Sequence, residues 1–112
     1  MRLFLVLYLA FLATTSMATT WTVSPSGKIK SIKLAIQQAN DGDTILVNKG
    51  HYKEGNIIVA KEVVLIGIDY PVIDGEYKHE VFTITANNVT IRNFNILNVG
   101  ISSLNDLAAI GG

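Results

Sequence analysis

Two stretches of the sequence decide the fold: "GNIIVAKEVVLIG" at residues 55–67 and "EVFTITANNVTIRN" at residues 80–93. Each holds two short segments in which apolar residues occupy alternate positions, a pattern typical of β-strands. When the stretches are aligned, apolar residues match at an offset of 25 positions in the first segment and 26 in the second. The pairs predicted to point inward and stack in columns are Ile57 with Phe82, Val59 with Ile84, Val63 with Val89, and Leu65 with Ile91.

A repeat of this length with several very short strands predicts a solenoid, whose coils pack only on their neighbours. In a parallel β-helix the coils lie about 4.8 Å apart, so like residues stack on like residues. The predicted coils are a first with strands around Ile45, Ile57 and Val63, a second around Val72, Phe82 and Val89, and a third that begins at Phe94. We therefore predict an all-β solenoid of about two and a half coils. The main alternative, a β-sandwich, would need strands of about five or six residues joined as hairpins.

Residues 31–40 are predicted to form a short helix that caps the solenoid. Ile32, Ala35, Ile36 and Ala39 follow the spacing of one buried helical face. Ser31 is a suitable N-cap residue, and residues 40–42, "NDG", form a stop signal. A helix of about two turns is not stable alone, so its role is to cover an apolar surface.

Residues 1–18 have the layout of a secretory signal peptide, and we expect a signal-peptide helix there. A basic start precedes the apolar run Leu3–Ala13, which is too short to span a bilayer. Ser16 and Ala18 suit the small-residue cleavage rule, which places the mature start near Thr19. The alternative is an uncleaved anchor or a buried helix. We expect a periplasmic or otherwise exported protein with no membrane span after cleavage, in which residues 19–112 belong to the solenoid domain.

Composition narrows the classes of partner. Nine basic and nine acidic residues balance in the whole chain, and cleavage would remove Arg2, leaving a net charge of −1. No run of Lys or Arg remains, which argues against nucleic acid as a partner. The chain has no cysteine, so no disulfide supports it. Because solenoids need about three or more repeats and capped ends, we expect a truncated solenoid, the N-terminal part of a longer domain.

Two histidines are the first candidates for chemistry. His51 lies in a Gly-His-Tyr turn, where we expect a solvent-facing side chain; a metal ligand or base is the alternative. His79 lies beside Glu76 and Glu80 in "DGEYKHE", which indicates a solvated charged loop more than a loose cation site. In the same stretch, Asp74 followed by Gly75 predicts a strand-end turn: Asp bonds its own backbone and Gly takes a positive φ.

Catalysis is not favoured by the distribution of carboxylates. The charged residues available for a lyase-like or epimerase-like site are Asp69, Asp74, Glu76, Lys78, Glu80 and Arg92. No two carboxylates stand at matched positions on successive predicted coils, as an acid–base pair or shared cation would require. We therefore assign no catalytic residue and expect a protein that is not an enzyme. Asn88-Val89-Thr90 matches a glycosylation sequon, but within a strand pattern we interpret it as part of the fold.

Residues 31–68, "SIKLAIQQANDGDTILVNKGHYKEGNIIVAKEVVLIGI", resemble the opening of exported right-handed β-helix proteins of pectin-lyase-like architecture. Residues 81–112, "VFTITANNVTIRNFNILNVGISSLNDLAAIGG", are similar to NosD-type proteins, periplasmic accessory proteins linked to copper supply and maturation of nitrous oxide reductase. The resemblance covers about residues 23–112, and full members of the family carry many more coils.

This resemblance implies a right-handed β-helix and a non-enzymatic role in copper delivery, together with an ABC-type ATPase and permease and a copper chaperone. The alternative is a carbohydrate-binding or polysaccharide-modifying β-helix protein of the cell surface.

Ligand types argue against copper binding by this chain itself. Cu(I) favours thiolate and thioether ligands, and the segment after residue 18 has neither Cys nor Met. His51 and His79 alone would make a weak, exchangeable site. We therefore predict no metal or cofactor site here and leave copper binding to the complete protein.

Overall fold

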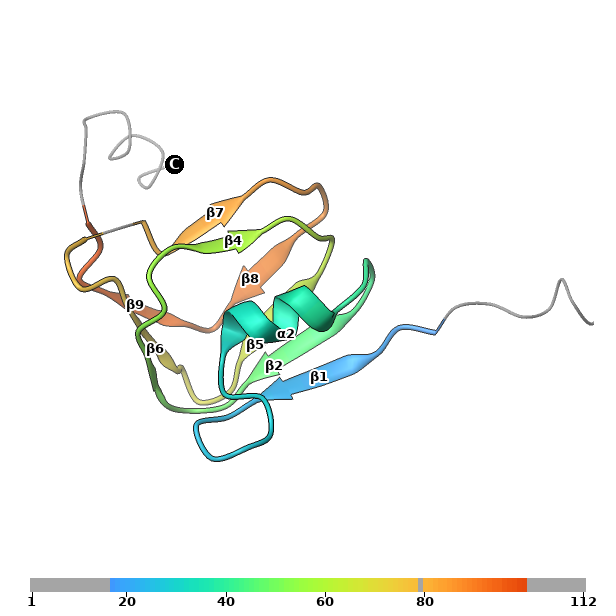
Figure 1. Ribbon diagram of the computed structural model, residues 1–112, viewed down its shortest axis with the longest axis horizontal. Helices are drawn as coiled ribbons and strands as arrows, with labels where there is room; N and C mark the ends of the chain where they lie inside the picture. Colours follow the sequence, from blue (N-terminus) through green and yellow to red (C-terminus); the bar gives the residue numbers. More distant parts are fainter. Residues whose placement is uncertain (1–16, 79, 101–112) are drawn as a thin grey trace, which may run out of the picture.

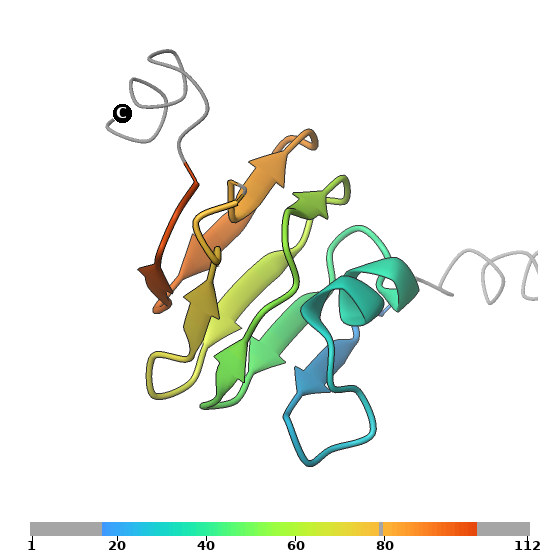
Figure 2. The same cartoon turned by 60° about the vertical axis from the view of Figure 1, so that its left-hand side comes forward.

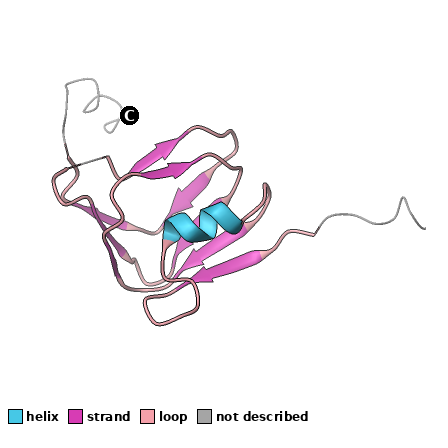
Figure 3. Ribbon diagram, viewed as in Figure 1, coloured by secondary structure: helices cyan, strands magenta, loops and turns pink. Residues whose placement is uncertain are grey.

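The computed structural model describes residues 17–78 and 80–100, which form a β-solenoid of about three turns with one short helix (Figures 1 and 3). The elements are β1 (Thr20–Val23), α2 (Ile32–Gln38), β2 (Thr44–Val47), β3 (His51–Tyr52), β4 (Ile57–Val59), β5 (Val64–Gly67), β6 (Val72–Asp74), β7 (Phe82–Ile84), β8 (Thr90–Arg92) and β9 (Asn95–Leu97). Every strand pairing within these residues is parallel. This confirms the all-β solenoid and excludes the hairpins of a sandwich.

The strands form three sheets, one for each side of the solenoid. Their orders are β1-β2-β5-β8, β3-β6-β9 and β4-β7. The chain runs through β2, β3 and β4, one on each side, and then returns to place β5 directly over β2 (Figure 2). Parallel strands need such crossovers, and here each crossover is one coil of the solenoid.

The strand register confirms the predicted repeat. Ile57 pairs with Phe82, and Val59 pairs with Ile84. Leu65 pairs with Ile91 in the neighbouring sheet, at the longer offset seen in the sequence. The two stretches that decided the fold are therefore successive rungs of the same ladders.

The predicted coil boundaries were wrong. Leu65 pairs with Ile45, so the segment around Val63 opens the second full coil instead of closing the first. Trp21 also pairs with Ile45 from below, which makes β1 a rung that the sequence did not reveal. The reason is that the coils differ in length, so comparing the two most similar stretches could not set the boundaries.

The core lies between the three sheets and thins toward the last described rungs. Ile57, Val59, Val63 and Leu65 are fully buried, as predicted. Their partners Phe82, Val89 and Ile91 are only half-buried and pack against this core. Ile84 is 51% exposed, contrary to prediction, because β7 pairs with β4 and with no further described strand.

The helix α2 supplies the third side of the first coil, next to β4. Its N-cap is Ser31, whose side chain accepts the backbone N–H of Leu34, as predicted. Ile32, Ala35, Ile36 and Ala39 are buried, and the helix contacts β1, β2 and β4. It ends where Ala39 turns to an extended conformation, and Gly42 has the positive φ expected of the stop signal.

The turns at the two ends of β4 hold the two ends of α2. Glu54 accepts the backbone N–H groups of Ile32 at 2.7 Å and Lys33 at 3.0 Å, and the Ser31 hydroxyl at 2.7 Å. Lys61 donates to the backbone carbonyls of Gln37 at 2.7 Å and Ala39 at 2.6 Å. An anion at the helix N-terminus and a cation at its C-terminus both complement the helix dipole.

Several expectations fall outside the described residues. These are the signal-peptide helix over most of residues 1–18, the side chain of His79, and the chain beyond residue 100. Within the residues that are described, no helix is long and apolar enough to cross a membrane.

Candidate functional site

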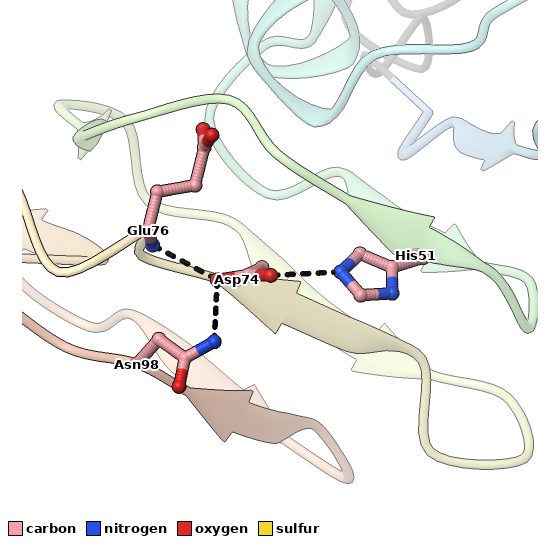
Figure 4. Close-up of polar contacts among 4 residues, drawn as sticks. All are labelled: His51, Asp74, Glu76 and Asn98. Atoms are coloured by element: carbon pink, nitrogen blue, oxygen red, sulfur yellow. Dashed lines mark hydrogen bonds and ion pairs between the residues drawn. The ribbon is translucent and has the colours of Figure 1, made fainter.

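The best-defined polar cluster lies on the outer side of the β3-β6-β9 sheet (Figure 4). His51 in β3 and Asp74 at the end of β6 approach within 2.9 Å, Nε2 to Oδ2. His51 is in register with Val72, so Asp74 is the diagonal neighbour on the same face of the parallel pair. The solenoid thus brings together two residues that are 23 positions apart.

Two further donors complete the surroundings of Asp74. Its Oδ1 accepts the backbone N–H of Glu76 at 2.9 Å and the side-chain amide of Asn98 at 3.1 Å. Asn98 follows β9, so side chains from three successive rungs meet at one carboxylate. The hydrogen bond from His51, followed by those from Glu76 and Asn98, lowers the pKa of Asp74 to about 2. Asp74 is therefore ionised at any ordinary pH.

The ionised carboxylate determines which ring nitrogen of His51 carries a hydrogen. A carboxylate can only accept hydrogen bonds, so Nε2 of His51 carries a hydrogen. In the neutral ring this leaves Nδ1 as the acceptor on a side chain that is 52% exposed, whereas the Asp74 side chain is only 11% exposed. Asp74 therefore holds the His51 ring so that Nδ1 can accept a hydrogen bond from a ligand on the solvent side. Within the described residues, no group of three or more His, Cys, Asp or Glu could hold a metal ion.

The prediction for His51 was half right. Its side chain faces solvent, but it lies in a strand and not in a bare turn, and it has a specific partner. The sequence did hold a signal for that partner. Asp74 lies 23 residues after His51, and Asn98 lies 24 residues after Asp74, close to the offsets of 21 and 23 that pair β3 with β6 and β6 with β9. A search for polar residues recurring at about the coil period would have marked these residues as candidates, but the unequal coil lengths leave their exact pairing to the folded structure.

The strand-end turn at Asp74 and Gly75 was predicted correctly in one respect and wrongly in another. Asp74 does bond its own backbone, at Glu76. The positive φ angles, however, belong to Glu76 at 54° and Tyr77 at 60°, and not to Gly75. Gly75 is needed for space, because a Cβ there would lie 2.6 Å from the carbonyl oxygen of Asn98.

The other charged candidates do not join the His51–Asp74 pair. Glu80 accepts a hydrogen bond from the Thr83 hydroxyl at 3.2 Å, a contact within its own coil. The exposed candidates are Asp69, Glu76, Lys78 and Arg92. Of these, only the backbone of Glu76 contacts Asp74.

The sequon asparagine was wrongly placed within a strand. Asn88 lies in the turn before β8, with φ of 55°, and it is exposed. Its side-chain amide donates to Glu62 at 3.2 Å. Asparagine tolerates the left-handed conformation better than most residues, which explains its place in this turn.

Two exposed aromatic residues bracket β6 along the chain. Tyr70, in the turn before the strand, is 65% exposed, and Tyr77, in the turn after it, is 77% exposed. Both have positive φ angles, which place them in tight turns. Each of these turns therefore presents a large aromatic face to solvent, the kind of surface that packs on apolar faces of ligands.

No protein-family model matches the chain, and no curated protein or solved structure matches it either. The function must therefore be argued from the fold, the polar cluster and the resemblance of the sequence.

Proposed function

We propose that the chain is an exported accessory β-solenoid of the NosD type, which aids copper delivery to nitrous oxide reductase. The proposal rests on the resemblance of residues 81–112 to NosD-type proteins, and the fold supports it only at the level of the solenoid: residues 31–68, which resemble the opening of exported β-helix proteins, occupy successive positions of a capped solenoid. The helix covers the core, the strand after Asp43 is β2, Tyr52 is buried in β3, and β5 ends at Gly67. This is the arrangement that the resemblance implies.

In this proposal the described coils are a scaffold and not a copper site. Their imidazole at His51 is bonded to Asp74, and one such ring without soft ligands would hold Cu(I) weakly. Copper would then be handled by the complete protein or by its partners, an ABC-type ATPase and permease and a copper chaperone. The parallel strands would supply rigid faces on which these partners assemble.

Deletion of the gene in its own organism tests this role. We expect nitrous oxide to accumulate while the reductase polypeptide is still made, with a reduced copper content measured by mass spectrometry. Re-expression of the whole gene should restore both. Unchanged nitrous oxide reduction in the deletion strain would refute the proposal.

A second candidate is a glycan-binding solenoid, favoured by the exposed Tyr70 and Tyr77 and by the outward His51. Aromatic faces pack on sugar rings, and an imidazole acceptor can bind a hydroxyl group. Titration with uronic-acid polymers tests it. Binding that is lost in Tyr70→Ala and Tyr77→Ala but kept in the exposed-lysine control Lys53→Ala would support this candidate, and absence of binding would reject it.

A further inference from the structure

The start of β1 is anchored to the residues that precede β2. The backbone N–H of Thr19 donates to Oδ1 of Asp43 at 2.8 Å. On its other side, the carbonyl of Thr19 accepts the backbone N–H of Thr44 at 3.0 Å. Thr19 is therefore held at both its nitrogen and its oxygen, one residue before the strand begins.

Asp43 is a buried carboxylate, only 2% exposed, that accepts three N–H groups. Besides Thr19, its donors are the indole of Trp21 at 3.0 Å and the backbone N–H of Asn40 at 2.9 Å, both to Oδ2. Hydrogen bonds from Asn40, then Thr19, then Trp21 lower its pKa, so it carries a negative charge. Among the described residues it forms no ion pair. These donors are neutral, and a cation at this place would add a charge-assisted hydrogen bond, which is stronger than a neutral one.

The sequence predicts a cleavage site at the backbone nitrogen of Thr19. Ser16 and Ala18 suit a signal peptidase that would cut between Ala18 and Thr19. Met17 and Ala18, which precede this bond, are exposed. They also line a hollow together with residues 40–43, which include Asp43. Removing them would leave room for water around a new terminal group.

We propose that Asp43 is the receptor for the processed N-terminus: hydrolysis of the Ala18–Thr19 bond places the new α-ammonium group of Thr19 against the Asp43 carboxylate. One water molecule is consumed. The bond between the Ala18 carbonyl carbon and the Thr19 nitrogen breaks, Ala18 leaves as a carboxylate, and the Thr19 amine takes up the proton. A neutral N–H···O⁻ hydrogen bond thereby becomes a charge-assisted one, which is stronger. Processing would therefore attach the start of β1 to the residues before β2 more strongly than in the precursor.

The other charges near this corner do not replace the new ammonium group. Lys61 is the cation that acts on Asp43, but its ammonium is bonded to the carbonyls of Gln37 and Ala39. Asp41 accepts the backbone N–H of Glu62 at 2.9 Å, and the Glu62 side chain accepts from Asn88. An ammonium group at Thr19 therefore finds Asp43 as its direct partner.

Linkage sets the pH dependence. Pairing with Asp43 raises the pKa of the α-amine above its ordinary value of about 8. The added stability is then fully present below about pH 8 and is lost as the pH rises through the raised value. A chain that still carries Met17 and Ala18 has an uncharged amide at this place and should lack this dependence.

The test compares two chains released from a cleavable N-terminal fusion, one starting at Thr19 and one at Met17. We expect the α-amine pKa of the Thr19 chain, measured by NMR, to exceed that of the Met17 chain by about one pH unit or more. We also expect its urea midpoint to fall more between pH 7 and pH 10. Equal α-amine pKa values in the two chains would overturn the proposal.

Matched variants assign the effect to Asp43. Asp43→Asn, which keeps the size of the side chain, should remove the difference between the two chains, and Asp41→Asn in the same turn should keep it. A difference that survives Asp43→Asn would also overturn the proposal. If that variant does not fold, the α-amine pKa of the unaltered Thr19 chain in the folded state and in denaturant decides. Finally, the intact mass of the exported protein must correspond to a start at Thr19.

Discussion

Asp74 and Asp43 show how single carboxylates join neighbouring coils. Asp74 accepts from His51 on the rung before it and from Asn98 on the rung after it. Asp43 likewise accepts from Thr19 and Trp21 of the rung below. Both are buried, and hydrogen bonds lower the pKa of both. Each of these carboxylates therefore links neighbouring coils near the end of a strand, as the columns of apolar side chains link them in the core.

Asp74→Asn should make the protein less sensitive to acid. The pKa of Asp74 is lowered to about 2, below the 3.8 of an ordinary aspartate. Its stabilising effect is therefore present above about pH 4 and is lost as the pH falls toward 2. We expect the urea midpoint of Asp74→Asn to be lower than that of the unaltered protein at pH 6, with the gap closing toward pH 2.

Asp69→Asn is the matched control, because Asp69 is an exposed aspartate whose positive φ asparagine also tolerates. Its midpoint should follow that of the unaltered protein at every pH. A constant gap between Asp74→Asn and the unaltered protein from pH 6 to pH 2 would show that the carboxylate charge is not what stabilises the turn.

At the scale of elements, α2 depends on side chains supplied by the next coil. Seven residues are too few for a helix to be stable in water. Glu54 and Lys61 hold its two ends, and its apolar face covers the core. The helix is therefore stable only when β4 is in place above it.

Glu54→Ala should destabilise the protein by about 1–2 kcal/mol, because it leaves the helix N-terminus without its anionic acceptor. Lys61→Ala should cost less, about 0.5–1 kcal/mol, since it acts on two carbonyls at the other end. Urea unfolding followed by circular dichroism measures both. Lys53→Ala, at an exposed neighbour of Glu54, should be within about 0.5 kcal/mol of the unaltered protein. Equal effects of Lys53→Ala and Glu54→Ala would contradict the role of Glu54 in holding the N-terminus of α2.

The sequence predicted those elements whose signal is either local spacing or a clear repeat. The helix follows from its own spacing and N-cap, and the ladder of Ile57 and Phe82 follows from the repeat. It did not lead us to predict β1, although Thr20 and Val23 match Thr44 and Val47 of β2, because this strand lies beside the predicted signal peptide and outside the two most similar stretches. Contacts between His51 and Asp74 or between Glu54 and Ile32 depend on how coils of unequal length align. That alignment is a property of the folded stack.

At the scale of the whole molecule, stability should be greatest in the middle of the stack. Leu65 is fully buried between Ile45 below and Ile91 above, whereas Ile91 is half-buried in β8. We expect Leu65→Ala to cost about 2–5 kcal/mol and Ile91→Ala clearly less, because a cavity costs most where the surroundings cannot relax. Denaturant titration of both variants measures this. A larger cost at Ile91 would show that the core does not thin along the stack.

The position of α2 also bears on the order in which the chain folds. Helical backbone groups bond within the helix, so α2 cannot serve as a template for another strand on its far side. In the β4-β7 sheet, strands can therefore be added only on the side away from α2, and each later coil packs on the one before it. A ribosome releases the N-terminal residues first. Each coil can thus dock as soon as it emerges, and the nascent chain does not have to wait for its C-terminus before it begins to fold.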